Sequence, residues 1–308
     1  MLVCAASRMT IQRIVYRGWQ DCLLLSNGMV EAIVVPTVGR VMQFRFTGDE
    51  LGPFWENEEL CGCVGDPSAG NEWLNFGGDK TWPSPQGDWE KQTGRAWPPP
   101  DAFDSFPYQA SVESDGVLLT SEVDGHYGIR AVRRVRLAPQ AQQLQVTTEF
   151  QKLSGAPVHV GVWVITQLRE PEWVFALLPE TTSFAKGYVQ QMGPEPKDAR
   201  RDGQLLSLKR DPREAVKIGT EAASLLWMDE HIALRICAED SAGEYPNGGS
   251  RTEIYTNPDP LRYVELETEG PVVTLNAGER TTRTNAYTLY PRSTPDCLLD
   301  ARHLFELD

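Results

Sequence analysis

Two glutamates near the end of the chain are the residues best suited to proton transfer. In the segment 261–267 the order of residues places Tyr263, Glu265 and Glu267 on one face of a predicted strand and apolar residues on the other. Two carboxylates about 7 Å apart on one face repel each other, which raises the pKa of one and prepares a general base. The alternative is the solvent face of an edge strand.

A glycine pair precedes a second group of candidates, in the segment 73–86 (WLNFGGDKTWPSPQ). Two glycines permit close backbone approach or positive φ, so Asp79 and Lys80 can be aimed into a cavity. The alternative is a structural loop in which Asp79 caps backbone amides and Lys80 is a solvated partner. The candidates for substrate binding in this segment are Trp73, Asn75, Asp79, Lys80, Trp82 and Gln86.

Two further segments alternate between apolar and polar positions. In 158–167 the valines share one parity, and His159, Trp163 and Gln167 occupy the other, where they could line a pocket. His159 is a candidate acid, and the alternative is a surface or core histidine with its hydrogen bonds satisfied. The segment 251–257 alternates in the same way and adds Glu253 and Tyr255 to the binding candidates, on a polar face that spans two strands.

His126 and Arg130 lie close together in the sequence, at a predicted turn and at the start of the strand that follows it. His126 is a further candidate acid. Arg130, Arg134 and Arg136 share one face of their strand, which is either solvated or lets Arg130 reach a sugar hydroxyl or an anionic group. A surface that combines aromatic rings with carboxylates, amides and Arg suits sugars, whose C–H faces pack on rings while their hydroxyls form hydrogen bonds.

The elements that must position these residues are predicted to be strands. The dipeptide Asn27-Gly28 between two apolar runs indicates a hairpin turn, and 41–46 alternates as a strand. From 52 to 107 the sequence turns to Gly, Pro, Asn, Asp and Trp, which predicts a long irregular connection, ordered because five Trp residues fall in it. We predict further strands at 117–123, 128–137, 144–150, 158–168, 223–227, 232–237, 251–256, 263–266, 272–275 and 281–290, a surface excursion at 190–214 and a helix at 296–307.

About a dozen strands with almost no helix and no fixed repeat indicate sheet-on-sheet packing. The predicted fold is all-β, a large antiparallel β-sandwich with long loops and little helix. We expect a single domain over residues 1–308, with its core at about 20–292, because sandwiches of this size commonly form one unit.

Composition and charge exclude several function classes. A formal net charge of −14 at pH 7 argues against a nucleic-acid partner, since phosphate binding depends on clustered Lys and Arg. The apolar runs are far shorter than the roughly 20 residues that span a bilayer, so no membrane partner is expected. The N-terminus lacks the basic region of a signal peptide, which favours a cytoplasmic location.

No metal or cofactor is predicted. Six cysteines are too few for a disulfide scaffold and are expected to be mostly reduced, and the Cys61-x-Cys63 pair has no second pair at zinc-like spacing. The sequence also has no G-x-S-x-G elbow, phosphate-binding loop, dinucleotide fingerprint or H-E-x-x-H motif. Hydride and phosphoryl transfer are therefore disfavoured.

Long motifs in the chain resemble a known group of proteins. The segments LSNGMVEAIVVPTVGRV, WLNFGGDKTWPSPQGDW, GIRAVRRVRL, VWVITQ, EIYTNPDP and YVELETEGP together look like an uncharacterised bacterial domain family of the galactose-mutarotase-like (aldose 1-epimerase-like) superfamily. The resemblance covers residues 23–290 and implies a β-supersandwich with a sugar-binding face. In the epimerase members it implies a Glu base and a His acid that interconvert α and β anomers.

By position, the resemblance makes Glu265 the base and Glu267 its competitor. The His-bearing strand motifs of the true aldose epimerases are absent, so His126, His159 or Lys80 is the candidate acid. We therefore expect a mutarotase-like isomerase, acting on a small-molecule sugar or sugar derivative as a monomer or weak homodimer. The alternatives are a non-catalytic carbohydrate-binding protein and a glycoside hydrolase or lyase that pairs Glu265 with Asp79 or Glu253.

Overall fold

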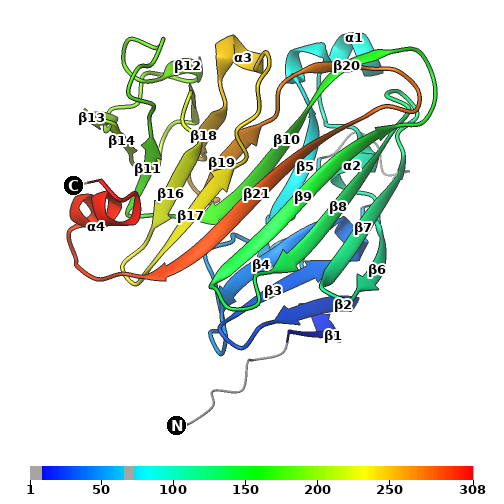
Figure 1. Cartoon of the computed structure of the whole chain (residues 1–308), viewed down its shortest axis with the longest axis horizontal. Coiled ribbons are helices and arrows are strands. Elements are labelled where there is room, and N and C mark those ends of the chain that lie inside the picture. The colour runs from blue at the N-terminus through cyan, green and yellow to red at the C-terminus, as the bar shows by residue number, and fades with distance from the viewer. Residues whose placement is uncertain (1–8, 66–72, 308) are drawn as a thin grey trace.

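Two large antiparallel sheets pack against each other in the computed structural model of the chain, which describes residues 9–65 and 73–307 (Figure 1). The first sheet has 11 strands, and β20 (Val273–Leu275) pairs with its β10. Its other strands are, in spatial order, β1 (Thr10–Tyr16), β2 (Trp19–Ser26), β3 (Val30–Val35), β4 (Arg40–Phe46), β5 (Asp79–Ser84), β10 (Val158–Arg169), β19 (Tyr263–Glu269), β18 (Thr252–Thr256), β15 (Val216–Thr220) and β12 (Val189–Met192).

The second sheet has 10 strands. They are, in spatial order, β13 (Arg200–Asp202), β14 (Leu205–Leu208), β11 (Trp173–Leu177), β16 (Ser224–Met228), β17 (Ile232–Ala238), β21 (Arg280–Pro291), β9 (Gln143–Lys152), β8 (Ile129–Leu137), β7 (Gly116–Val123) and β6 (Gln109–Glu113). The helices are short: α1 (Trp89–Thr93), α2 (Asp101–Asp104), α3 (Pro246–Gly249) and α4 (Cys297–Leu304), with 3-10 turns η1 (Pro36–Val38), η2 (Glu58–Leu60) and η3 (Gln86–Asp88). The predicted fold class, a large antiparallel β-sandwich with little helix, is confirmed.

The core lies between the two sheets and follows from strand alternation. Val160, Val162 and Val164 of β10 belong to one apolar cluster with Leu144 and Tyr287 of the second sheet. Burying each such side chain contributes about 1.5–3 kcal/mol relative to leaving it in water. The alternation fixes which residues face the core, and it leaves the other parity of β10 on the opposite side of the first sheet.

The hairpin turn and the C-terminal helix predicted from the sequence are both present. The predicted hairpin turn forms at Asn27, whose side-chain oxygen accepts hydrogen bonds from the backbone amides of Met29 and Val30 at 2.9 and 3.0 Å. The predicted C-terminal helix is α4, and the Asp296 carboxylate caps its first backbone amides.

Cys4 lies outside the described residues, and the other five cysteines are free thiols. In the described part of the chain, no helix has the length and apolarity that a membrane crossing requires.

The prediction of an irregular connection from 52 to 107 is wrong for residues 79–84, which form a strand inside the first sheet. Residues 79–84 form β5, which lies between β4 and β10 in the first sheet. The sequence DKTWPS has no apolar alternation, because one side of the strand carries polar groups and the other side an ion pair. The excursion predicted at 190–214 likewise contains three short strands, β12, β13 and β14.

Candidate functional site

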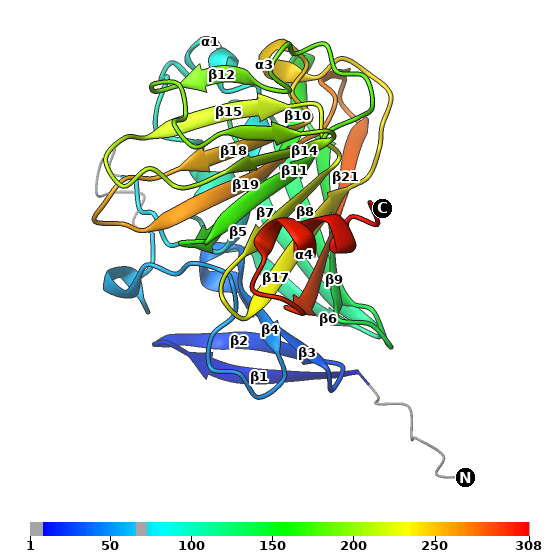
Figure 2. The same cartoon turned by 90° about the vertical axis from the view of Figure 1, so that its left-hand side faces the viewer.

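Five neighbouring strands of the first sheet present polar side chains on the side away from the second sheet. The inward side of β19 is identified by Thr268, whose hydroxyl contacts Asn285 of β21 in the second sheet. The strands run side by side (Figure 2). We call their outward side chains the polar face: Lys80 and Trp82 of β5, Trp163 and Gln167 of β10, Glu265, Glu267 and Glu269 of β19, Glu253 and Tyr255 of β18, and Lys217 of β15.

An ammonium group links two of the carboxylates on the polar face. Lys217 Nζ lies 2.6 Å from Glu253 Oε2 and 2.9 Å from Glu267 Oε2. Trp163 Nε1 donates a hydrogen bond to Glu267 Oε2 at 2.6 Å, and the ammonium lies over the Trp163 ring. Burial works to lower the pKa of Lys217, but the two carboxylates outweigh it and raise that pKa. Lys217 therefore stays charged and fixes the position of Glu267.

Several buried polar atoms on this face have no hydrogen-bond partner among the described residues. They are Glu267 Oε1, Glu269 Oε2, Gln167 Oε1 and Lys80 Nζ, on side chains at most 1% exposed. An unsatisfied buried polar group costs about 1–3 kcal/mol, so a cluster of them on one face marks a candidate site, where water or a ligand would supply the missing partners. No three His, Cys, Asp or Glu side chains within residues 9–65 and 73–307 are placed to hold a metal ion.

Burial also shifts the acid-base properties of these groups. Removal from water raises the pKa of Glu267 to about 8, although Lys217 opposes this shift. Burial, helped by Glu253, raises the pKa of Glu269 well above its usual value. The pKa of Lys80 falls to about 8 through burial and the neighbouring Arg40 guanidinium. Groups that titrate near neutral pH are suited to proton transfer.

Lys80 is held between two indole rings. Its Nζ lies 4.8 Å from the ring centroid of Trp73 and 4.3 Å from that of Trp82. Asp104 fixes both rings, because it accepts hydrogen bonds from Trp73 Nε1 at 3.1 Å and from Trp82 Nε1 at 2.8 Å. Asp104 also pairs with the buried Arg40 at 2.9 Å. The Trp-rich segment is thus the support that positions Lys80.

Asp79 lies on the opposite side of β5 from Lys80, inside the sandwich. Its carboxylate pairs with Arg133 of β8 and accepts hydrogen bonds from Tyr287 at 2.6 Å and Thr166 at 2.8 Å. The preceding glycines do have positive φ, +94° at Gly77 and +72° at Gly78, and both pack closely against backbone. The structure therefore brings only Lys80 of this pair to the polar face and gives Asp79 the partners of a core residue.

Four other predicted residues do not join the polar face. His126 is exposed in the turn after β7, and Gln86 is exposed in η3 beyond the end of β5. His159 is exposed at the start of β10, about 13 Å along the strand from Trp163. Arg130 of β8 faces away from the first sheet and, with Arg134 and Glu149 among others, lines a small cavity on the outer side of the second sheet.

The remaining predicted residues lie at or beside the polar face. Asn75 is nearly buried and has an unpartnered Oδ1. Tyr263 is the outward-facing residue that precedes Glu265 in β19. The Trp55 ring stacks on the Tyr263 ring, with the two ring centroids 4.5 Å apart. Tyr255 pairs in register with Glu265 and donates a hydrogen bond to Asn257. The edge-strand alternative for 263–267 is excluded, since β19 lies between β10 and β18.

Two members of the polar face were not predicted. Glu269 continues the alternation of Glu265 and Glu267, so extending the strand by two residues would have found it. Lys217 gives no such signal, because it is a single Lys between apolar residues in a segment far from β19 in sequence. Its role becomes visible only when β15 and β18 pair and bring it to the carboxylates.

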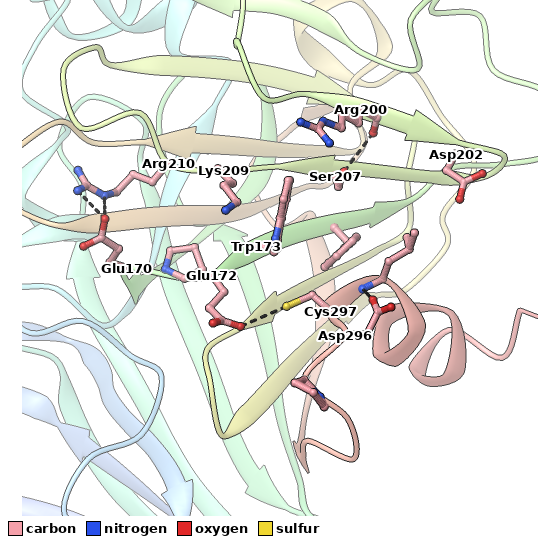
Figure 3. Close-up of a pocket in the computed structure, with 14 residues that line it drawn as sticks. Glu170, Glu172, Trp173, Arg200, Asp202, Ser207, Lys209, Arg210, Asp296 and Cys297 are labelled. Carbon is pink, nitrogen blue, oxygen red and sulfur yellow. Dashed lines mark hydrogen bonds and ion pairs between the residues drawn. The ribbon is translucent and has the colours of Figure 1, made fainter.

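The molecule also has an open cleft of about 730 Å³ on the second sheet, beside α4 (Figure 3). Its carboxylates already have partners: Glu170 pairs with Arg210 at 2.6 Å, and Glu172 with Arg292 at 2.7 Å. None of the described side chains that line it has a buried polar atom without a hydrogen-bond partner. Although this cleft is larger than any other cavity described, we favour the polar face because four buried polar atoms without hydrogen-bond partners lie together there on three neighbouring strands, and none lines the cleft.

Comparisons with known proteins agree on the architecture. No protein-family model matches the chain, and a search of curated proteins finds no match either. Among solved structures, a galactose mutarotase-like protein from Lactobacillus casei is 11% identical, with a TM-score of 0.59 over 87% of this chain and 100% of that one. A galactose mutarotase-like protein from Clostridium acetobutylicum is 10% identical, with a TM-score of 0.58 over 92% of this chain and 99% of that one.

A galactose mutarotase related enzyme from Lactobacillus acidophilus is also similar, at 10% identity and a TM-score of 0.55. It is matched over 89% of this chain and 98% of its own length. Identities this low speak for the fold and not for the activity. The chain therefore has the galactose-mutarotase-like fold, as its sequence motifs indicated.

Proposed function

We propose that the protein is a carbohydrate-directed enzyme that interconverts the α and β anomers of a sugar. The observation that carries the proposal is the set of unpartnered buried polar atoms on the polar face, with indole rings beside them. Sugar hydroxyls supply the missing hydrogen bonds, and C–H faces pack on indole rings. The solved structures with this fold include proteins described as galactose mutarotase-like, which supports the choice of reaction.

Glu265 is the proposed general base. It is the most exposed of the four carboxylates on the polar face, at 8%, and so the one that an entering sugar meets first. Gln167 Nε2 donates to its Oε1 at 2.7 Å, which orients the carboxylate and leaves Oε2 for the substrate. Glu267 is less suited to this role, because Trp163 and Lys217 hold one of its oxygens and its pKa of about 8 keeps it protonated near neutral pH.

Lys80 is the proposed general acid. Its ammonium has no hydrogen-bond acceptor among the described residues, and a pKa of about 8 leaves it mostly protonated at pH 7 while easing loss of the proton. Glu265 takes the proton of the anomeric hydroxyl as Lys80 protonates the ring oxygen, and the C1–O5 bond breaks to give the open-chain aldehyde. Rotation about the C1–C2 bond and the reverse proton transfers then close the ring as the other anomer.

The proposal is tested by following a freshly dissolved single anomer of glucose or galactose by polarimetry or NMR. The protein should speed the approach to equilibrium, and Glu265→Gln should slow it by about 10²-fold or more. Glu113→Gln is the matched control, because Glu113 is a strand glutamate of β6, in the second sheet. Unchanged rates across a panel of aldoses would overturn the proposal, and binding without turnover would identify a carbohydrate-binding protein instead.

A further inference from the structure

The polar face opens toward the loop that precedes β19. Glu267 is fully buried and Glu265 is 8% exposed, whereas Leu261, in that loop, is 39% exposed. Beside the loop lies a cavity of about 350 Å³, which is lined by Trp55 and Leu261 among others. A ligand on the polar face therefore has room to extend in this direction.

Trp55 lies in line with the proposed base, on the other side of β10. Phe54 pairs with Leu168, and the Trp55 amide donates to the Gln167 carbonyl at 2.9 Å, so Trp55 lies opposite Gln167. Gln167 in turn pairs in register with Glu265 of β19. Paired segments lie about 4.8 Å apart, so the Cα atoms of Trp55 and Glu265 are separated by two such spacings, about 10 Å. At that separation Trp55 is placed to contact the unit attached to a sugar that Glu265 holds.

A row of aromatic rings connects the polar face with this cavity. Tyr255 pairs in register with Glu265, and the centroid of its ring lies 6.2 Å from that of Tyr263. The Tyr263 ring stacks on Trp55, with the centroids 4.5 Å apart, and Trp55 is partly exposed where it lines the cavity. A ring fixed by stacking offers a rigid apolar surface, on which the C–H face of a sugar packs.

The charged groups that line the cavity balance each other. They are three arginines and three glutamates: Arg17, Arg169, Arg262, Glu56, Glu58 and Glu59. Arg17 pairs with Glu56 at 3.0 Å. Arg169 pairs with Asp229 at 3.2 Å, and Arg262 lies 3.5 Å from Asp259. A phosphate or carboxylate on the ligand would have to displace these carboxylates, whereas a neutral sugar needs only hydrogen bonds, so the cavity suits a neutral ligand.

We propose that Trp55 is the stacking platform of a second sugar subsite, so that the preferred substrate is a neutral reducing disaccharide or longer glycan. This inference rests on the proposed function, because it places the reacting sugar at Glu265 on the polar face. Ring opening needs a free anomeric hydroxyl on that sugar. The second sugar must therefore be attached through one of the other hydroxyl groups, as it is at the reducing end of a glycan.

The test compares sugars that carry the same reacting unit, with the full chain at pH 7. Polarimetry gives kcat/KM for anomer interconversion of glucose and of maltose, cellobiose and lactose, which all have glucose at the reducing end; galactose is compared with galactobiose in the same way. Contacts to a remote part of a substrate lower the barrier at its reacting centre, so we expect at least one disaccharide to exceed its monosaccharide about tenfold or more. Equal values throughout, or a preference for glucose 6-phosphate over every disaccharide, would overturn the inference.

Two variants locate the subsite. Trp55→Ala removes the platform and should bring the preferred disaccharide to the value of its monosaccharide, while Trp173→Ala, at a partly exposed tryptophan of β11 in the second sheet, should keep the preference. Leu261→Trp fills the cavity from an exposed position and should also remove the preference, and Leu299→Trp, at an exposed leucine of α4, is its control. If Trp55→Ala does not fold, Leu261→Trp decides. A preference that survives in a folded Trp55 or Leu261 variant would refute the subsite.

Failure of the subsite and failure of the proposed function give different results. Interconversion of glucose or galactose without preference for any disaccharide would refute the subsite and leave the proposed function standing. Calorimetry on the same sugars covers the opposite case. Binding of a disaccharide about tenfold tighter than its monosaccharide, abolished by Trp55→Ala and without any interconversion, would refute the proposed function and support the subsite.

Discussion

Asp79 and Lys80 are neighbours on one strand, and the structure treats their charges in opposite ways. Asp79 points between the sheets and finds a guanidinium and two hydroxyl groups, from Arg133, Tyr287 and Thr166. Lys80 points outward, is equally buried, and has no hydrogen-bond acceptor among the described residues. Two adjacent residues therefore carry buried charges of different kinds: Asp79 has an ion-pair partner and hydrogen-bond donors, and Lys80 has no hydrogen-bond acceptor.

Structural and functional charges in this fold differ in whether their hydrogen-bond and ion-pair partners are present. A buried charge with a full set of partners holds the sheets together, and its removal should cost stability. A buried charge without partners lowers the stability of the folded protein. A protein retains such a charge when a ligand or a reaction needs that group. The comparison makes opposite predictions for the two residues.

The largest expected effect is on Asp79. Asp79→Asn keeps the shape of the side chain but leaves the Arg133 guanidinium buried without a counterion. Loss of one partner of a buried pair costs about 3–5 kcal/mol, so the free energy of unfolding should fall by about that amount in urea titrations. A change below about 1 kcal/mol would mean that the inter-sheet pair is not the structural element that we infer.

Lys80→Met should act in the opposite direction. Methionine keeps the length and the contact with the indole rings, and it removes a buried ammonium that has no hydrogen-bond acceptor. We expect the free energy of unfolding to stay the same or to rise by about 1–3 kcal/mol. The rate of anomer interconversion should fall by about 10²-fold, and Lys152→Met serves as the control for loss of a buried lysine elsewhere. A Lys80 variant as unstable as the Asp79 variant would remove the distinction between them.

The arrangement of most strands could be predicted from the sequence, and β5 could not. Hairpins and alternating strands such as β2, β3 and β10 have one apolar face, and the period of two reveals them. β5 has Lys80 and Trp82 on one side and Asp79 on the other, so it shows no such period. Because β5 has polar residues on both sides, apolar alternation along the sequence does not reveal it as a strand.

The glutamates and the β10 residues of the candidate site could be predicted from the sequence, but the lysine that pairs with the glutamates could not. Glu265, Glu267, Trp163 and Gln167 were found because parity along a strand can be read from the sequence alone. Parity does not show which charges meet across strands, and so it missed Lys217. It also gave no reason to separate Asp79 from Lys80 until β5 was known to be a strand, since in a loop both can point the same way.

The pH dependence of stability provides a further test of a buried charge on the polar face, with a smaller expected effect. The pKa of Glu267 is about 8 in the folded protein and 4.5 at its ordinary value, so between these limits the folded state holds a proton that the unfolded chain has lost. Stability from this group is present below pH 4.5 and is lost as pH rises through 8, by up to about 1.4 kcal/mol per pH unit. Glu267→Gln should flatten the slope of unfolding free energy against pH in this window, and Glu113→Gln should not. An unchanged slope in the Glu267 variant would show that this carboxylate is not protonated by its burial, and that the polar face is better supplied with partners than its geometry indicates.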